Sequence, residues 1–530
     1  MKFKKLKLIF VMLLSFVLVA CGSSSEETES NNNNVEETEN NADENVEVRM
    51  AYDSIPPTLD PHMSTATATF DFATQIFEPL YAIDSDYEPQ PILAESHEES
   101  DDGKMVTIHL REGVKFHNGE ELTAEDVVAS MDKWVEQSTI GSANLSEAEF
   151  EAEEDYTVTI HLEEANPFIL DTLATPQQFA GIIPKEIVDN ASKDGITEYI
   201  GTGPFKVESY DDTQQLHLKK YEDYQSVDTP SDGLSGEKEV KIDDLYIDIV
   251  TDETIRVSGL QTGEYDIAAR LPYDNAEELE SDDNIKTFAE PFGFQGIWFN
   301  KKDGPLKDIK MRKAINNALD MNAISLAAYT DEKYFDLSHS IVTEDQKLWY
   351  TEAGSDQYNI NDPEKSEELL DEAGYDGEEL TFLTTREYPQ HYQAAVVIKD
   401  QLEEIGMNIN LEEYDWATLL DIRKDPETWD ILTTGFNFEP FPADAVYLHS
   451  KNDGSGGWND NDKIDSLVEE IKASNSKEEA SELFEELQEE LWDYVPFIPF
   501  SHHKPLFAMQ ENIDGFDINY SMIFWNLEKK

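Results

Sequence analysis

PILAESHEESDDGKMVTIHLREGVKFHNGEELTAEDVVASMDKW, residues 91–134, is the stretch from which the fold can be worked out. Val106, Ile108 and Leu110 alternate with polar residues, which is the period of a half-buried strand. An Asn-Gly pair at 118–119 then turns the chain. The first half of the stretch therefore predicts strands joined by tight turns.

A helix is predicted after these strands. Thr123 and Asp126 have the spacing of a capping box, with Asp in the usual Glu position, so the helix should begin just after Thr123. The apolar residues that follow recur at helical spacing, and one face of the helix is therefore apolar. These residues are Val127, Val128, Met131 and Trp134.

Three segments of this stretch closely resemble extracellular solute-binding proteins of family five, the dipeptide and oligopeptide receptors of ABC importers. These segments are LAES, DDGK and HLREGVKFHNGEELTAEDV. The resemblance implies an α/β fold with two lobes, like periplasmic binding proteins of class II and of the large peptide-binding type. It also implies an extra small subdomain in the first lobe, which contains this stretch beside the ligand cleft without contacting the substrate.

Phrases elsewhere extend the resemblance. GTGPF at 201–205 and GEYD at 263–266 are family-like, and GIWFN at 296–300 resembles the strand by which relatives pass from the first lobe to the second. From residue 308 onward, helices alternate with strands, as expected for an α/β lobe. Asp362 followed by proline should begin one of these helices.

Domain limits follow from these phrases. The pentapeptide VTIHL occurs at 106–110 and again at 158–162, which predicts two strands of one sheet. The expected limits are lobe I at 46–297 with a small subdomain at about 82–198, lobe II at 298–495, and a C-terminal return to lobe I at 496–530.

The N-terminus has the pattern of a secretory signal at 1–20, with four lysines before an apolar run too short to span a bilayer comfortably. The run ends in Leu-Val-Ala before Cys21, which looks like a lipobox. A free buried thiol is the alternative, but the position directly after the signal favours lipidation. We expect a flexible acidic linker at 21–45 and a lipid anchor that holds the protein on the extracellular face of the cell membrane.

The chain of 530 residues is strongly acidic, with a formal net charge of −75. This charge argues against nucleic acid as a partner, because phosphates would be repelled. The acidic residues are spread along the chain, so a solvated surface explains them better than a cation site. We interpret this acidity as adaptation to salty or alkaline surroundings.

Catalytic motifs are missing from the sequence, which has no GxSxG, no HExxH and no phosphate loop. Two Ser-x-x-Lys matches, at 474–477 and 501–504, lack the further elements that a β-lactamase needs. His449, His502 and His503 could hold a metal, as in nickel-binding relatives, but adjacent histidines on a strand point to opposite faces. We therefore expect no enzyme activity, no cofactor and no metal.

A peptide ligand needs a cation for its carboxylate and an anion for its amino group. Arg386, one of seven arginines, follows a predicted strand at 380–384. Together with Tyr388 it resembles the Arg-x-Tyr segment of dipeptide receptors, which implies that this segment binds the peptide carboxylate. From residue type alone, the alternative is a surface ion pair.

Resemblance also suggests the amine end of the site. Phe436 follows a predicted strand at 429–433 and falls where relatives carry an aromatic residue, and Glu439 falls where they carry the Asp that pairs with the amine. Asp444 is a competitor for that contact. Trp416 and Trp458 either wall the pocket or belong to a core.

These features predict a lipid-anchored, two-lobed substrate receptor of an ABC importer. It should close on a short peptide and present it to the permease subunits, and we expect it to be a monomer. The same fold binding a nickel chelate, a sugar or an opine is the alternative. A secreted hydrolase is possible in principle, but no motif supports it.

Overall fold

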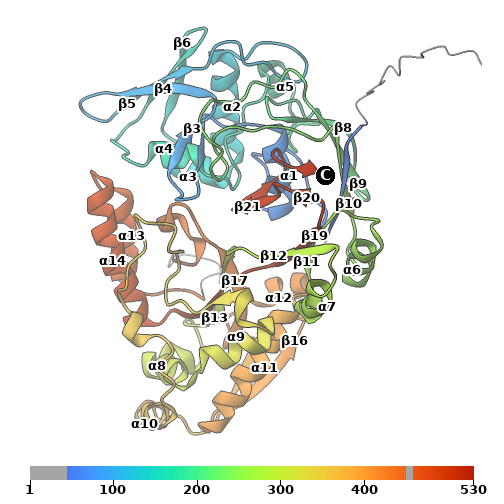
Figure 1. The fold of residues 1–530 in the computed structure, drawn as a ribbon. Helices are drawn as coiled ribbons and strands as arrows, with labels where there is room; N and C mark the ends of the chain where they lie inside the picture. The colour runs from blue at the N-terminus through green and yellow to red at the C-terminus, as the bar shows by residue number, and fades with distance from the viewer. Residues whose placement is uncertain (1–44, 449–456) are drawn as a thin grey trace, which may run out of the picture. The chain divides into compact units, whose positions relative to one another are not determined.

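Two large β-sheets organise the chain (Figure 1). The computed structural model describes residues 45–448 and 457–530, and the structural statements below refer to these residues. The predicted signal peptide at 1–20, the linker up to residue 44, the lipidation site Cys21 and the candidate ligand His449 lie outside them.

The first sheet has seven strands in the order β12-β19-β11-β1-β10-β9-β8. Its centre is parallel, because β1 pairs in parallel with both β10 and β11. Strand β19, which comes from the C-terminal part of the chain, lies between β11 and β12. The strands are β1 (Glu47–Tyr52), β8 (Phe205–Asp211), β9 (Gln215–Lys220), β10 (Asp244–Ile249), β11 (Ile267–Leu271), β12 (Ile285–Phe288) and β19 (Leu506–Gln510).

The second sheet has six strands in the order β14-β18-β13-β17-β15-β16. β15 runs parallel to β16 and β17, whereas β13 is antiparallel to β17 and β18. The strands are β13 (Gly293–Phe299), β14 (Phe335–Asp336), β15 (Glu379–Thr384), β16 (Asn408–Glu413), β17 (Ile431–Asn437) and β18 (Phe497–His503). The helices of this part, in the lower half of Figure 1 and along its left side, are α8 (Ile309–Ala318), α9 (Met321–Tyr329), α10 (Pro363–Ala373), α11 (Pro389–Glu404), α12 (Trp416–Ile422), α13 (Asp462–Lys472) and α14 (Lys477–Tyr494).

A smaller four-stranded sheet, in the order β4-β5-β7-β6, contains both VTIHL segments. Val106 pairs with Ile160 and Ile108 with Val158, which confirms that the two segments are strands of one sheet. Helix α2 packs against this sheet and begins with the predicted capping box, in which the Thr123 amide donates to Asp126 at 2.9 Å. The elements are β4 (Ala94–Glu99), β5 (Met105–Leu110), β6 (Glu149–Glu154), β7 (Thr157–His161) and α2 (Ala124–Gln137).

Short elements complete the described chain. They are α1 (Thr67–Ile76), α3 (Thr139–Leu145), α4 (Ile169–Ala174), α5 (Lys185–Asp189), α6 (Glu253–Thr262), α7 (Ala276–Glu280), β2 (Tyr81–Ile83), β3 (Pro89–Pro91), β20 (Ile513–Asp514), β21 (Asp517–Asn519), β22 (Ser521–Ile523) and β23 (Glu528–Lys529).

The sequence predicts the ends of one helix correctly and the end of another incorrectly. Asp362 caps α10 as predicted, and Gly374 ends it with φ at 75°. The spacing of Ile76, Phe77 and Leu80 predicts a helix through all three residues, and this prediction is wrong, because α1 ends at Ile76. The reason is Pro79, which disfavours helical backbone in the residue before it.

Strand pairing shows where the chain passes between the two large sheets. The chain leaves β12 in the first sheet and enters β13 in the second across residues 289–292. It returns between β18 and β19, across residues 504–505. The lobe limits expected from the sequence, at 297 and 495, stay predictions.

Apolar residues of the sheets pack into large buried cores. Val48, Met50 and Tyr52 alternate along β1 and belong to one of these cores, whereas Ala51 between them belongs to another. Both faces of this central strand are therefore covered, as expected for parallel strands. Among the described residues, the helices are all too short or too polar to cross a bilayer.

Candidate functional site

A cavity of about 760 Å³ lies between the two large sheets. Its walls are formed where parallel strands end: β1, β10 and β11 of the first sheet, and β15, β16 and β17 of the second. Ligands of open α/β sheets bind outside the carboxyl ends of parallel strands, so both sheets present their binding edge to the same cavity.

The wall contributed by the first sheet is partly charged. Asp53 follows β1, Arg256 lies in α6 after β10, and Arg270 lies at the end of β11. Thr67, at the start of α1, lies on the same wall. The other residues of this wall are Ser54, Ile55, Ala66, Ala68, Thr251, Glu253, Leu271, Tyr273, Pro505 and Leu506.

The wall contributed by the second sheet is mostly aromatic and includes three predicted site residues, Tyr388, Trp416 and Phe436. The rings of Tyr388 and Trp416 are nearly perpendicular, with centroids 5.4 Å apart. Phe436 lies in β17 itself, which corrects the expectation that it follows the strand. The other residues of this wall are Phe292, Gln295, Glu387, Pro389, Gln390, His391, Gly435, Asn437 and His503.

Arg386 does not line the cavity, although its neighbour Glu387 does. Its guanidinium is exposed and pairs with Glu413. It also lies over the ring of Tyr392, with 3.4 Å between the guanidinium carbon and the ring centroid. In this arrangement Arg386 has the geometry of a surface ion pair.

Glu439 and Asp444 also lie outside the cavity lining. Within the described part of the chain, the Glu439 carboxylate has no hydrogen bond or ion pair. Burial raises its pKa to about 8, and the negative charge of Asp444 adds to the effect. Asp444, by contrast, is bonded to Lys472 at 2.7 Å and to Asn144 at 3.2 Å. Of the two carboxyl groups, Glu439 is therefore the one without a cationic partner among the described residues.

Trp458 belongs to a core. It packs with Leu383, Leu419, Trp429 and Leu432, and its ring centroid lies 5.9 Å from that of Trp429. Of the two tryptophans considered from the sequence, Trp416 alone lies at the cavity.

Sequence reasoning missed Arg270 and Asp53. Arg270 donates to Asp53 at 3.0 Å and to the buried Asp71 at 3.4 Å, and its guanidinium lies over the ring of Tyr52. The signals available were an arginine four residues after the family-like phrase GEYD and an aspartate three residues after the alternating apolar residues Val48 and Met50. Neither signal says that the two side chains meet.

The histidines near the cavity are neutral at neutral pH. Burial lowers the pKa of His391 to about 4 and that of His503 to about 3. His503 lines the cavity, whereas His502 faces the other way, toward the Ser340 carbonyl at 2.8 Å. Over residues 45–448 and 457–530, His, Cys, Asp and Glu side chains form no group of three that could hold a metal ion.

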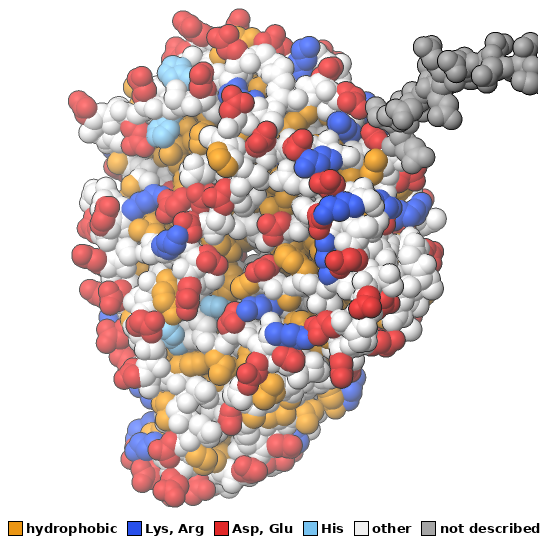
Figure 2. Space-filling model, viewed as in Figure 1, with side chains coloured by type: hydrophobic (Ala, Val, Ile, Leu, Met, Phe, Trp, Pro, Cys, Tyr) orange, Lys and Arg blue, Asp and Glu red, His pale blue; other side chains and the backbone are white. Residues whose placement is uncertain are grey.

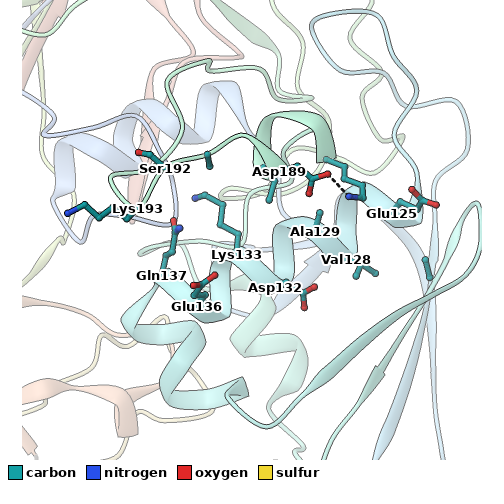
Figure 3. A pocket seen from close by; sticks show the side chains of 14 residues that line it. Glu125, Val128, Ala129, Asp132, Lys133, Glu136, Gln137, Asp189, Ser192 and Lys193 are labelled. Atoms are coloured by element: carbon teal, nitrogen blue, oxygen red, sulfur yellow. Dashed lines mark hydrogen bonds and ion pairs between the residues drawn. The ribbon is translucent and has the colours of Figure 1, made fainter.

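A second hollow, of about 500 Å³, lies between α2 and the stretch formed by α5 and the residues that follow it (Figure 3). Two of its lysines are already paired: Lys133 donates to Asp60 at 2.8 Å, and Lys185 pairs with Asp189 at 2.6 Å.

Acidic side chains are scattered over the face seen in Figure 2, with basic ones among them. This distribution fits a solvated acidic surface better than one cation-binding patch.

Comparisons with known proteins agree with this architecture. The family model described as bacterial extracellular solute-binding proteins, family 5, matches residues 88–458. A relative from Sinorhizobium fredii, named "Probable peptide ABC transporter periplasmic-binding protein", is 29% identical over an alignment of 514 positions that covers 91% of this chain and 93% of the relative.

Solved structures share the fold. The ABC transporter substrate binding protein CtaP of Listeria monocytogenes has a TM-score of 0.80 at 22% identity, over 92% of this chain and 99% of its own. A dipeptide binding protein from Pseudoalteromonas sp. SM9913, solved with Met-Leu, has a TM-score of 0.76 at 23% identity, over 91% of this chain and 100% of its own. The α/β, two-lobed fold class predicted from the sequence is confirmed.

Proposed function

The chain belongs to the bacterial extracellular solute-binding proteins of family 5, and from this premise we propose that it captures short peptides outside the cell and delivers them to the permease of an ABC importer. Members of this family bind solutes, and it is not a family of enzymes. The relative from Sinorhizobium fredii is named for peptide transport, and the Pseudoalteromonas neighbour was solved with a dipeptide.

The observation that supports this proposal most is the cavity between the two sheets. Its volume of about 760 Å³ is that of a small-molecule site. Apolar rings on one wall and charged groups on the other suit a ligand that has both side chains and charged ends. Helices and strands of both sheets form the walls, so closure of the two parts would surround the ligand.

Within the cavity, we assign the ligand's side chains to Tyr388, Trp416 and Phe436. Aromatic rings bury much apolar area with little conformational freedom to lose. Glu439 remains our proposal for the ligand's amino group, with Asp444 as the less available alternative. Arg386, the carboxylate contact that the resemblance implies, could reach the ligand only if the segment after β15 turned inward from the position seen here.

The same proposal includes the anchor and the partners. A diacylglycerol on Cys21 would hold the receptor on the extracellular face of the cell membrane, next to its permease. The acidic linker up to residue 45 would allow the folded receptor to lie at some distance from the membrane surface. We propose that it works as a monomer with a short peptide and the permease subunits as its partners.

Native mass spectrometry of the protein purified from producing cells tests this function. A retained mass that fragments as a peptide is the expected result, because tight receptors often keep their ligand. A nickel chelate, a sugar or an opine in its place would contradict the peptide proposal and favour the alternative ligands of the same fold.

A further inference from the structure

The backbone at Arg270 is unusual for a strand. Arg270 has φ at +46°, which non-glycine residues rarely adopt. The pairing of β11 with β19 shifts register between Ala268 and Leu271, so a bulge lies at this point. Bulges redirect side chains, and strained residues cluster at ligand-binding sites. The bulge turns Arg270 toward the cavity that it lines.

Arg256 holds this bulge in place. It is 4% exposed, and it donates from Nε to the Ala269 carbonyl at 3.1 Å and from Nη2 to the Arg270 carbonyl at 3.0 Å. Its Nη1 donates to the Val250 carbonyl at 2.8 Å, which ties the ends of β10 and β11 together. The backbone that carries Arg270 is therefore fixed before any ligand arrives.

The Arg270 guanidinium lies between two aromatic rings, 4.9 Å from the centroid of Tyr52 and 5.8 Å from that of Phe292. Phe292 belongs to the segment that joins the two sheets, so the guanidinium faces the space between them. Arginine has five N–H donors in a planar fork, and the bonds to Asp53 and Asp71 leave it the capacity to bond a further acceptor.

The two acidic partners of Arg270 differ in how firmly they are held. Asp71 is buried and accepts from the Tyr52 hydroxyl at 2.6 Å and from the Met522 amide at 3.3 Å. Asp53 lies at the cavity wall, where its side chain is 27% exposed, and its other bond is a long one from Ser54 at 3.4 Å. An incoming anion can therefore take the place of Asp53 beside Arg270 while Asp71 stays.

The start of helix α11, on the opposite wall, also favours a negatively charged ligand group. Helix α11 starts at this wall, with no side-chain cap and no acidic residue in its first turn. The helix dipole favours negative charge at this end, although Pro389 has no N–H and the His391 amide already donates to the Tyr388 carbonyl at 3.0 Å. His391, in that first turn, is 6% exposed, and its Nδ1 has no hydrogen-bond partner within the described chain. The ring is neutral and bonds the Thr433 carbonyl through its other nitrogen, so Nδ1 is an acceptor and a ligand N–H would satisfy it.

We propose that the guanidinium fork of Arg270 receives the carboxylate of the ligand. This inference rests on the proposed peptide function and deepens it, because it restricts the ligands to short peptides with a free carboxylate. Asp53, once released from Arg270, is then free to bond a cationic group of the same ligand. Arg386, which pairs with Glu413 outside the cavity, is not needed for this contact.

The test offers the full chain an enzymatic hydrolysate of casein, once untreated and once with its carboxyl groups converted to amides. Retained peptides are measured by native mass spectrometry. Wild type should retain peptides from the untreated hydrolysate alone. Arg270→Gln should retain them about 30-fold more weakly or worse, as expected when one partner of a buried charge pair is removed.

Arg49→Gln is the matched control. Arg49 also pairs with an aspartate, Asp248 at 2.7 Å, and lies over a tyrosine ring, that of Tyr246, but it does not line the cavity. This variant should retain peptides as wild type does. If Arg270→Gln does not fold, Arg270→Lys keeps a cation beside Asp71 and should still bind weakly, because an ammonium cannot reproduce the fork.

The outcomes separate the inference from the function on which it rests. Equal retention of both hydrolysates by wild type, or wild-type retention by folded Arg270→Gln or Arg270→Lys, would overturn the inference and leave the peptide function standing. Retention of neither hydrolysate by wild type would contradict the peptide function, and the inference with it.

Discussion

Phe168 stacks on Phe441, with ring centroids 4.7 Å apart and 28° between the ring planes. Phe168 follows the small four-stranded sheet, whereas Phe441 follows β17 of the second large sheet. Phe168 is 1% exposed and packs among aromatic residues of the second part, including Trp349. The two parts of the chain are therefore joined by side chains as well as by the crossing segments.

Charged groups reinforce this contact. Lys477, at the start of α14, bonds to Asp171 of α4 at 2.9 Å and to Glu88 at 3.2 Å. We call Phe168, Phe441, Lys477 and Asp171 the latch. Its residues do not line the cavity, whereas the crossing segments do so through Phe292 and Pro505. Changes in the latch should therefore affect closure without touching the ligand.

The first prediction concerns the latch. Phe168→Ala removes a buried ring, a change that typically lowers the free energy of unfolding by about 3–5 kcal/mol. Because this ring packs between the two parts, the substitution should destabilise mainly their closed arrangement. We expect the ligand-free variant to have a larger radius of gyration in small-angle scattering and to release peptide faster in stopped-flow experiments. Phe150→Ala, a half-buried position on the small sheet, is the control. Unchanged scattering in Phe168→Ala would count against the latch.

The second prediction concerns Glu439 and pH. With a pKa of about 8, its carboxyl is mostly protonated at pH 7. If it pairs with the ligand's ammonium, the charged form is favoured and binding at pH 7 should release about 0.9 proton from it. Affinity should rise with pH toward about 8 and then fall as the ligand's amino group loses its own proton.

Calorimetric titration in buffers of different ionisation enthalpy measures this release. Glu439→Gln should abolish it and flatten the pH profile below 8, whereas Asp444→Asn should keep the release and move the profile to lower pH, because it removes a charge that helps to raise the pKa of Glu439. The stability consequence has a definite sign: a raised carboxyl pKa favours the folded state at low pH, and this contribution is lost as pH rises toward 8. Identical proton release by wild type and Glu439→Gln would exclude Glu439 as the amine contact.

Local signals in the sequence sufficed for many elements and for part of the site. The capping box at Thr123 and the cap at Asp362 depend on residues a few positions apart, so they can be recognised without the fold. The predicted strand ends at residue 433, before Phe436, and Gly435 and Asn437 are residue types that are depleted in strands. Pairing with the whole of β13 nevertheless extends β17 to Asn437.

The remaining site residues depend on contacts between distant segments. Asp53 and Arg270 are 217 positions apart and meet because β1 and β11 are neighbours in the sheet. The bulge that turns Arg270 toward the cavity arises from pairing with β19, near the other end of the chain. Contacts between segments so far apart cannot be recognised from the spacing of residues in the sequence. The resemblance to dipeptide receptors therefore predicts Arg386, and not Arg270, as the carboxylate contact.

The third prediction distinguishes the two arginines. Because Arg386 is exposed, paired with Glu413 and outside the cavity lining, we expect Arg386→Ala to change peptide affinity by no more than about threefold. If the segment turns inward on binding and Arg386 holds the carboxylate, the loss should instead reach about 30-fold or more. Calorimetry with a free and an amidated peptide decides between them.

The fourth prediction concerns the anchor. Cys21 is the one cysteine of the chain, so Cys21→Ser should abolish labelling with a radioactive fatty acid and leave the protein unlipidated. Membrane and soluble fractions of producing cells, compared by immunoblot, measure the consequence. Continued labelling of the variant would show that the lipid is attached elsewhere.

The last prediction concerns salt. With 114 acidic and 39 basic residues, the folded chain repels itself, and the repulsion is weakened only where ions screen it. The screening length falls from about 30 Å at 0.01 M salt to about 10 Å at 0.1 M, which shortens the reach of this repulsion across the protein. The melting temperature should therefore rise steadily over this range and change less beyond it. Sucrose at matched osmolality is the control, because it stabilises folded proteins without screening charge. A melting temperature that is the same at both salt concentrations would contradict adaptation to salty surroundings and leave alkaline surroundings as the explanation for the acidity.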